Sequence, residues 1–300
     1  MPLALHKSLF MKQLFILVAL CYTYTATAQV KNDRILYGQI TIDSLQQPPY
    51  NKWYKEGYNA YTVNASIKSL YNQAMLKGVT IDAFFGSWCG DSKRELPHFI
   101  KLLDEVKFDK KNLRIIATGG SDSLYKKSPT GEENGKGIFR VPTFIVYKDG
   151  KEINRINEFP VQSLERDLLI ILQNKDYKPN YKSFSTVNKW LSEDVLIDSN
   201  VSVRGLAMQV KQDVASEFEL NSLGYLLLNH KQFKEAMSIF RINANLFPES
   251  ANTLSSLGEA YLETGDKVKA IMLFEKSMEY NPSPELRKEI VDLLLKAKKE

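Results

Sequence analysis

Cysteine is scarce in this chain, which has two cysteines in 300 residues, at positions 21 and 89. Two cysteines can close at most one disulfide, so the sequence excludes the small, disulfide-stapled class of secreted domains. A strong charge of one sign is also lacking, because 40 basic residues face 35 acidic ones and the formal net charge is +5. Since no arginine-rich stripe is present either, we expect no nucleic-acid binding.

The first 28 residues have the pattern of a secretory signal peptide. Lys7 and Lys12 supply a basic start, Leu14 to Leu20 is an uninterrupted apolar run, and Ala26-Thr27-Ala28 is a small-residue cleavage signal. The apolar run is too short to span a bilayer. We therefore expect an exported chain with no transmembrane segment in its mature form.

Export would leave one cysteine in the mature chain, whether translation begins at Met1 or at Met11. Cys21 lies within the predicted signal peptide, and lipid attachment there is not expected because Leu20 is larger than the small residue that should precede a lipid-modified cysteine. Cys89 would then be an unpaired thiol with no internal disulfide partner. Such a thiol is either reactive or a buried structural residue, and its local sequence favours the first alternative.

The stretch from Gly86 to Lys93 places Cys89 at the junction of two predicted elements. The apolar run at 79–85 predicts a buried strand, and the spacing of apolar residues at 92–106 predicts an amphipathic helix. A cysteine at a helix start meets unpaired backbone amides and the positive end of the helix dipole. Both favour thiolate over thiol, so the sequence predicts a reactive sulfur at Cys89.

The segment WCGDSKRELP, from Trp88 to Pro97, resembles the active-site segment of the thioredoxin superfamily, in which a tryptophan precedes a CxxC motif. Pro97 lies eight residues after Cys89, where thioredoxins also carry a kinking proline. Ser92 stands in place of the second cysteine of the family. A serine cannot attack a mixed disulfide, so an external thiol would have to complete any catalytic cycle, although the Ser92 hydroxyl could donate a hydrogen bond to the sulfur.

A second segment, 137–151, resembles the other thioredoxin signature, because Val141-Pro142-Thr143 leads into an apolar strand and Asp149-Gly150 is a hairpin signal. The resemblance implies a cis bond before Pro142, which would lie against the Cys89 sulfur, and a Val141 backbone free to pair with an extended peptide. It implies no metal and no cofactor. The residues implied to be catalytic are Cys89, Ser92, Trp88 and Pro142, and those implied to bind substrate are Val141, Trp88, Gly90 and Asp91.

Two positions depart from the family pattern. Asp91 replaces the common proline and puts a carboxylate beside the sulfur, which Lys93 partly offsets. The buried acid that many thioredoxins place six residues before the cysteine falls on Ala83. Asp82 is one position off and by strand alternation should face the other side, so we assign it no role in proton transfer.

The remaining elements of the N-terminal half complete the fold class. An extension at 29–76 is predicted to contain a strand at 35–42, an aromatic cluster at 50–61 that forms core or lid in preference to a peptide groove, and a helix at 64–76. A strand at 113–118, a mobile loop at 121–136, a return strand at 153–156 and a helix at 163–173 follow. We thus predict an α/β thioredoxin-like domain, a mixed sheet flanked by helices, at 77–174.

Beyond a polar linker at 175–188, the pattern is helical throughout 189–300, with further helices expected at 184–213 and 283–297. A 34-residue period relates two repeats, at about 217–250 and 251–284, and resembles the tetratricopeptide repeat. Such arrays bind proteins on a concave face, or the short array only braces its neighbour; both readings stay open. The matched pairs are Leu220 with Leu254, Leu223-Gly224 with Leu257-Gly258, Ala236 with Ala270, Phe240 with Phe274, and Pro248 with Pro282.

Two functions follow from these patterns. The first is an exported monothiol thiol–disulfide oxidoreductase, expected in a bacterial periplasm. It would act through Cys89 on protein or glutathione mixed disulfides while its helical repeats recruit a protein partner. The second is a non-catalytic binding or scaffold protein with the same fold. A peroxide-reducing enzyme is disfavoured, because Gly86 stands where a threonine would lie three residues before the cysteine.

Overall fold

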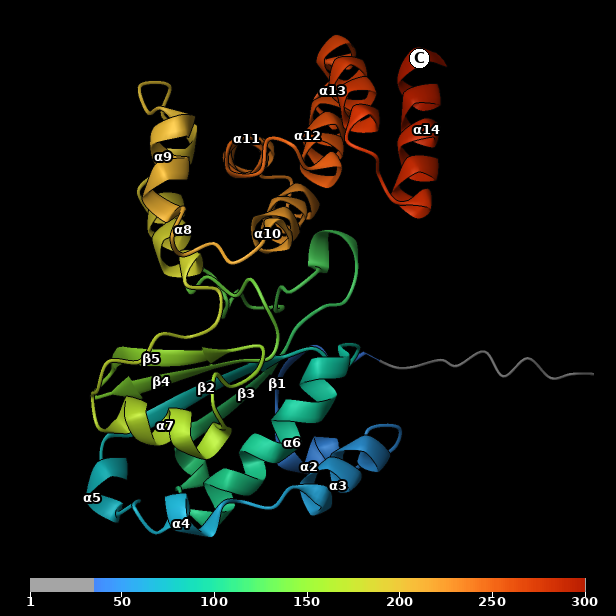
Figure 1. The fold of residues 1–300 in the computed structure, drawn as a ribbon. Coiled ribbons are helices and arrows are strands. Elements are labelled where there is room, and N and C mark those ends of the chain that lie inside the picture. Colours follow the sequence, from blue (N-terminus) through green and yellow to red (C-terminus); the bar gives the residue numbers. More distant parts are fainter. Residues whose placement is uncertain (1–34, 300) are drawn as a thin grey trace, which may run out of the picture. The chain divides into compact units, whose positions relative to one another are not determined.

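The computed structural model describes residues 35–299, and the predicted signal peptide lies outside them. A five-stranded mixed sheet has the strand order β1-β3-β2-β4-β5 (Figure 1). β2 and β3 are parallel, as the predicted βαβ unit requires, and every other neighbouring pair is antiparallel. The strands are β1 (Gly38–Ile40), β2 (Val79–Phe85), β3 (Leu113–Ala117), β4 (Thr143–Lys148) and β5 (Lys151–Asn157).

Helices pack against one face of this sheet because alternate residues of β2 point to opposite sides. Ala83 and Phe85 share a core with α6 and α7, whereas Phe84 faces the other side, where Trp88 and Cys89 pack. The predicted α/β class, a mixed sheet flanked by helices, is confirmed. The helices and turns of this part are α2 (Ile42–Leu45), α3 (Asn51–Ala60), α4 (Ala65–Lys68), α5 (Gln73–Leu76), α6 (Gly90–Glu105), η1 (Lys110–Asn112), η2 (Asp122–Leu124) and α7 (Leu164–Leu172).

The extension before β2 differs from the prediction in two elements. The strand expected at 35–42 is shorter, since β1 spans Gly38–Ile40 and α2 already begins at Ile42. The helix expected at 64–76 is wrong: the chain forms two short helices, α4 and α5, because it starts a helix twice. Asn64 accepts the Ile67 amide and Asn72 accepts the Met75 amide, each at 3.1 Å, so both asparagines act as N-caps. The aromatic cluster behaves as core: residues of α3 pack against α6.

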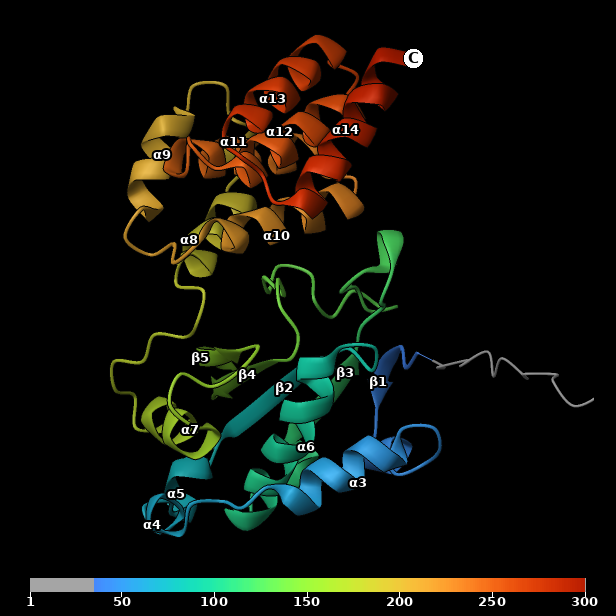
Figure 2. The ribbon, with the colours of Figure 1, turned by 45° about the vertical axis from the view of Figure 1, so that its right-hand side comes forward.

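The C-terminal part is all-helical, and we refer to residues 183–299 as the helical region (Figure 2). Its helices pack in sequence, α10 on α11 and α12 on α13, with α14 against α13. Among residues 35–299, no helix is both long and apolar enough to cross a membrane. The elements are α8 (Ser183–Ser192), η3 (Val195–Ile197), α9 (Val203–Val210), α10 (Glu217–Asn229), α11 (Phe233–Leu246), α12 (Ala251–Glu263), α13 (Lys267–Glu279) and α14 (Pro284–Lys299).

The 34-residue period has a direct packing consequence. A Cβ built at Gly224 would lie 2.6 Å from the Phe240 ring, and one at Gly258 would lie 2.8 Å from the Phe274 ring. Both rings are fully buried, so neither has room to move aside. The repeated glycine therefore lets each pair of helices approach closely enough to enclose the repeated phenylalanine.

We expect Gly224→Ala to lower the free energy of unfolding by about 1.5 kcal/mol, because the added methyl group overpacks the seam against Phe240. The matched control is Gly205→Ala in α9, where the nearest atom to a built Cβ is the Ser202 Cβ at 3.6 Å. That variant should gain up to about 1 kcal/mol from helix propensity. Urea unfolding of both variants measures the difference, and equal effects would contradict the close approach.

Candidate thiol site around Cys89

Cys89 is the N-cap of α6. Its backbone is extended, with φ −85° and ψ 129°, and its amide donates to the Gly86 carbonyl at 2.9 Å in the turn that follows β2. No side chain caps the first turn of this 16-residue helix, so the sulfur lies beside the amides that the helix leaves unpaired. The side chain is half-buried. The sulfur therefore lies at a helix start, on a residue that is not fully buried.

The second signature lies directly against this sulfur. The Cys89 thiol donates to the Val141 carbonyl oxygen at 3.3 Å, across 52 residues of sequence. The Val141–Pro142 peptide bond is cis, as the resemblance implied. On either side of it the backbone is anchored, because the Arg140 carbonyl accepts the Thr143 hydroxyl and the Pro142 carbonyl accepts the Glu158 amide. The fold thus brings the two sequence signatures together.

Trp88 forms one wall of the site. Its indole nitrogen donates to the Thr118 carbonyl at 3.0 Å, just after β3 ends, which fixes the orientation of the ring. The ring of Tyr125 lies against it, with centroids 5.1 Å apart. Trp88 itself remains half-buried. The indole therefore offers an apolar surface beside the sulfur.

The residues after Cys89 divide between surface and core. Gly90 is exposed, with open space where a side chain would be. Ser92 is fully buried, and its hydroxyl oxygen accepts the Gly86 amide at 3.0 Å, so this position supports the turn before the helix. Asp91 forms an ion pair at 2.8 Å with Arg94, and not with the Lys93 that we expected to offset its charge.

Asp82, the acid on β2, is paired with two cations and not with the Cys89 thiol. Asp82 is 2 % exposed and accepts hydrogen bonds from Arg114, at 2.7 and 2.5 Å, and from Lys136 at 2.9 Å. Burial alone would raise the pKa of this carboxyl, but the two cations more than offset that effect and hold the pKa below its usual value. Asp82 therefore serves as the centre of a charge cluster on β2 and β3.

Sequence reasoning missed Lys126, a buried lysine whose amine interacts electrostatically with the sulfur. Lys126 is 5 % exposed, lies in the segment expected to be a mobile loop, and donates from Nζ to the Phe139 carbonyl at 2.8 Å. Burial, and to a smaller extent nearby Arg140, lowers the pKa of this amine to about 8, while Glu158 and Cys89 act in the opposite direction. The cation thus interacts electrostatically with the sulfur.

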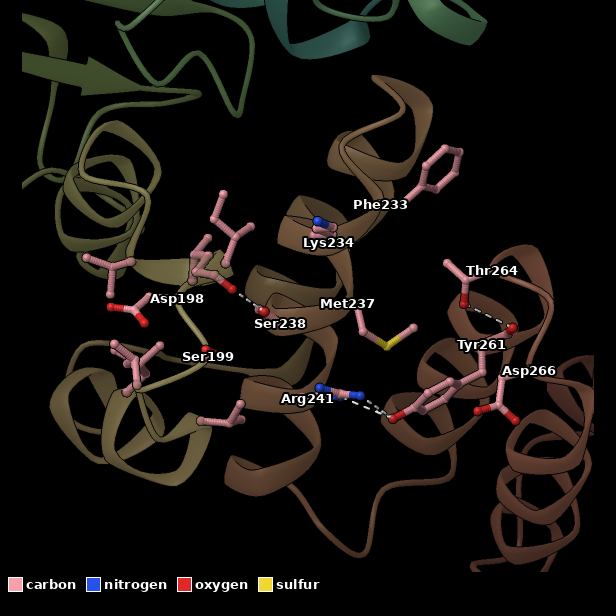
Figure 3. Close-up of a pocket in the computed structure, with 16 residues that line it drawn as sticks. Asp198, Ser199, Phe233, Lys234, Met237, Ser238, Arg241, Tyr261, Thr264 and Asp266 are labelled. Atoms are coloured by element: carbon pink, nitrogen blue, oxygen red, sulfur yellow. Dashed lines mark hydrogen bonds between the residues drawn. The ribbon is translucent and has the colours of Figure 1, made fainter.

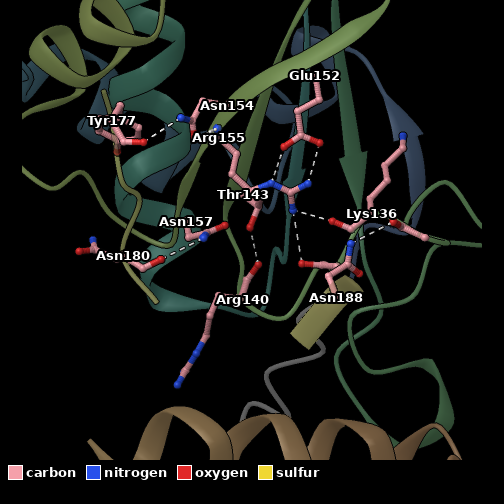
Figure 4. Close-up of polar contacts among 12 residues, drawn as sticks. Lys136, Arg140, Thr143, Glu152, Asn154, Arg155, Asn157, Tyr177, Asn180 and Asn188 are labelled. Carbon is pink, nitrogen blue, oxygen red and sulfur yellow. Dashed lines mark hydrogen bonds and ion pairs between the residues drawn. The ribbon is translucent and has the colours of Figure 1, made fainter. Parts of the chain in front are cut away.

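Sequence reasoning also missed an ion pair whose two residues lie at opposite ends of the β4–β5 hairpin, one before β4 and one after β5. Arg140, one residue before the signature, forms an ion pair with Glu158 at 3.5 Å, and the Tyr181 hydroxyl donates to the same carboxylate. Burial raises the pKa of Glu158, although Arg140 opposes that shift. Figure 4 shows Arg140 extending away from the network around Arg155 and Glu152. The position of Arg140, one residue before Val141-Pro142-Thr143, was the one feature of the sequence that could have pointed to this pair.

The helical region contacts two segments of the thiol site, the one that contains Tyr125 and Lys126 and the one that contains Phe139 and Arg140. His230, the C-cap of α10, bonds from Nε2 to the Tyr125 carbonyl oxygen at 2.6 Å. Burial lowers the pKa of this imidazole. Ser222, on the same helix, accepts from Arg140 Nη2 at 2.8 Å. Phe139 also packs into the core of the helical region, edge-on to Phe184 with centroids 5.1 Å apart.

Two of the cavities among the described residues are large and lie away from Cys89. One, of about 450 Å³, is in the helical region, where Arg241 donates twice to the Tyr261 hydroxyl, at 3.1 and 2.7 Å, and Met237 lies between η3 and α12 (Figure 3). The other, of about 630 Å³, lies beside β5 and is lined by groups such as Asn154 that already bond to backbone carbonyls. Cys89 lines neither cavity.

Comparison with known proteins gives two partial similarities, and no family model matches. Over 105 residues the chain is 28% identical to a thioredoxin of Chlamydia caviae, which corresponds to 35% of this chain and 89% of that protein. Over 101 residues, 34% of this chain, it is 31% identical to Superkiller protein 3 of Schizosaccharomyces pombe, of which it spans 7% of the length. The chain therefore has a distant thioredoxin-like relationship over about a third of its length.

Proposed function

We propose that this chain is an exported monothiol thiol–disulfide oxidoreductase that forms mixed disulfides through Cys89. The observation that carries the proposal is the position of Cys89, a half-buried residue at the start of α6 whose sulfur lies 3.3 Å from the Val141 carbonyl oxygen. The proposed substrates are disulfides of polypeptides or of low-molecular-weight thiols. Export to a bacterial periplasm rests on the signal-peptide pattern of the first 28 residues.

The reaction would proceed in two thiol–disulfide exchanges. The Cys89 thiolate attacks one sulfur of the substrate, a new S–S bond forms to Cys89, and the departing sulfur leaves with the electron pair of the broken bond and takes a proton from water. Trp88 and the Pro142 turn border the sulfur on which this exchange occurs. Because Ser92 has no thiol, a second, external thiolate must attack the mixed disulfide to release Cys89 in its reduced form.

A scaffold function is the second candidate. It is favoured by the cavity between η3, α11 and α12, which could hold part of a polypeptide without any help from the thiol. In that reading the Cys89 side chain is dispensable. The two candidates differ in whether the interaction with a partner survives loss of the sulfur.

We expect the reduced protein to gain the mass of one thiol when it is mixed with an excess of a disulfide-bonded peptide, and to lose that mass when free thiol is added. Cys89→Ser should show no mass gain, because it removes the attacking sulfur while keeping the size of the side chain. Intact-protein mass spectrometry without reductant gives the readout. A wild-type protein that stays unmodified would contradict the oxidoreductase, and equal partner capture by Cys89→Ser would favour the scaffold.

A further inference from the structure

Two cations near the Cys89 sulfur, Lys126 and Arg140, share one carboxylate, that of Glu158. The two carboxylates near the sulfur are each paired with an arginine, Asp91 with Arg94 at 2.8 Å and Glu158 with Arg140 at 3.5 Å. The Lys126 ammonium instead donates to a neutral carbonyl, that of Phe139. Among the described residues Lys126 forms no ion pair of its own, and Glu158, which acts on it at longer range, is already paired with Arg140. The cost of burying the Lys126 charge is therefore compensated only in part within the fold, which is the pattern expected of a group that meets a charge supplied from outside.

Helix α10 holds the segment that carries this charge. His230 bonds to the carbonyl of Tyr125, the residue immediately before Lys126. The Tyr125 ring lies 4.7 Å from the Lys126 nitrogen on one side and against Trp88 on the other. Lys126 itself has a φ of 59°, a left-handed conformation that a lysine rarely adopts and that its surroundings must maintain.

The same helix holds the cation on the other side of the signature. Ser222 accepts a hydrogen bond from Arg140 at 2.8 Å, and the guanidinium lies 4.8 Å from the Tyr181 ring centroid. Ser222 and His230 are eight residues apart, about two turns along α10. A single helix therefore contacts both segments that carry a cation near the sulfur. We call Lys126 and Arg140 the cationic wall.

We propose that α10, through His230 and Ser222, positions the cationic wall so that Cys89 reacts preferentially with disulfides that carry negative charge next to the S–S bond. This inference rests on the proposed function, since it names the class of disulfide that the sulfur accepts. His230 and Ser222 are positioning residues, because they act through Tyr125 and Arg140. The exchange is the one described above, in which the leaving thiolate of an anionic disulfide carries further negative charge away.

The experiment compares two disulfide probes at pH 7 and low salt on the full chain, with Cys21→Ser in every variant so that Cys89 is its one thiol. The dianionic probe is 5,5′-dithiobis(2-nitrobenzoate) and the neutral one is 4,4′-dithiodipyridine, and both report the released thiol by absorbance. The measured quantity is the ratio of their second-order rate constants with Cys89, anionic over neutral. Intrinsic differences between the probes cancel when this ratio is compared between variants, and a loss of stability alone does not change it.

We expect Lys126→Met to lower the ratio about fivefold, as removal of one nearby charge should, and His230→Ala to lower it about threefold. His230→Gln should restore it, because the glutamine amide can still donate to the Tyr125 carbonyl. The matched control is Asn229→Ala, an exposed neighbour on α10, which should leave the ratio unchanged. In 1 M salt, screening should shrink the effect of Lys126→Met.

The outcomes separate the inference from the function on which it rests. If neither probe reacts with Cys89 in the wild-type protein, the oxidoreductase proposal fails and the inference falls with it. If both probes react but Lys126→Met leaves the ratio unchanged, the charge preference is wrong while the function stands. If Lys126→Met lowers the ratio and His230→Ala does not, the positioning role of α10 is overturned.

Discussion

Lys126→Met should raise the free energy of unfolding at pH 7 by about 2 kcal/mol, although it removes a hydrogen bond. Burial lowers the pKa of this amine from 10.5 to about 8, and a shift of that size corresponds to roughly 3 kcal/mol of stability lost to holding the charge inside the fold. The variant also leaves the Phe139 carbonyl without its donor, which reduces the gain in the free energy of unfolding by about 1 kcal/mol. Urea unfolding at pH 7 measures the net gain.

The pH dependence of the difference in stability between Lys126→Met and the wild-type protein tests whether the buried charge causes it. Because the folded pKa of Lys126 lies below that of the unfolded chain, the unfolded state binds more protons between pH 8 and pH 10.5, and the stability of the wild-type protein gains from this group as the pH rises. The variant lacks that gain, so its advantage should shrink from pH 7 to pH 9.5. Taking the difference between the two proteins cancels all other titrating groups. An advantage that stays constant with pH would contradict the burial of a charged Lys126.

The sequence could predict the centre of the site because its geometry is local. A strand that ends at Phe85 and a helix that begins at Gly90 leave Cys89 no place except the junction, whatever surrounds it. The Val141-Pro142-Thr143 signature was equally recognisable, and its cis bond and its contact with the sulfur are present. Residue types at fixed spacing carried both predictions.

The rest of the site depends on contacts that no spacing encodes. Tyr125 and Lys126 lie in a polar stretch with proline and glycine nearby, and composition of that kind predicts a loop on the surface. The contact between Tyr125 and His230 joins residues 105 positions apart, and the two belong to parts of the chain with different sequence patterns. A buried lysine is also the side chain that composition most strongly assigns to solvent.

The failed helix at 64–76 has a different origin. The apolar spacing that suggested one helical face is present, but Asn72 lies in its middle and takes an extended conformation, with φ −140° and ψ 158°. Asparagine competes with helix formation by bonding its own side chain to nearby amides, which makes it a good cap and a poor interior residue. Periodicity outweighed that local preference in the prediction, and the local preference decided the structure.

Ser92→Cys should convert a protein that retains its mixed disulfide into one that releases it. Position 92 is three residues after Cys89 at the start of α6, and residues with this spacing in a helix lie on one side, at a separation that suits a disulfide. An attacking thiol held there acts at an effective concentration of roughly 1 M or more, against about 1 mM for added thiol. We therefore expect the adduct on Cys89 to have a lifetime about a thousandfold shorter in Ser92→Cys without added thiol than in the wild-type protein with about 1 mM thiol, measured by acid quenching and mass spectrometry.

The structure also sets the control for this prediction. Ser92 is fully buried and its hydroxyl accepts the Gly86 amide, so any change at this position disturbs the turn that precedes Cys89. Ser92→Ala removes the same hydrogen bond without supplying a thiol, and its adduct should persist as it does in the wild-type protein. If Ser92→Cys also retains its adduct, the side chain at 92 points too far into the core to reach the sulfur. The missing cysteine would then not be what separates this chain from a dithiol enzyme, because the buried orientation of position 92 would itself prevent release.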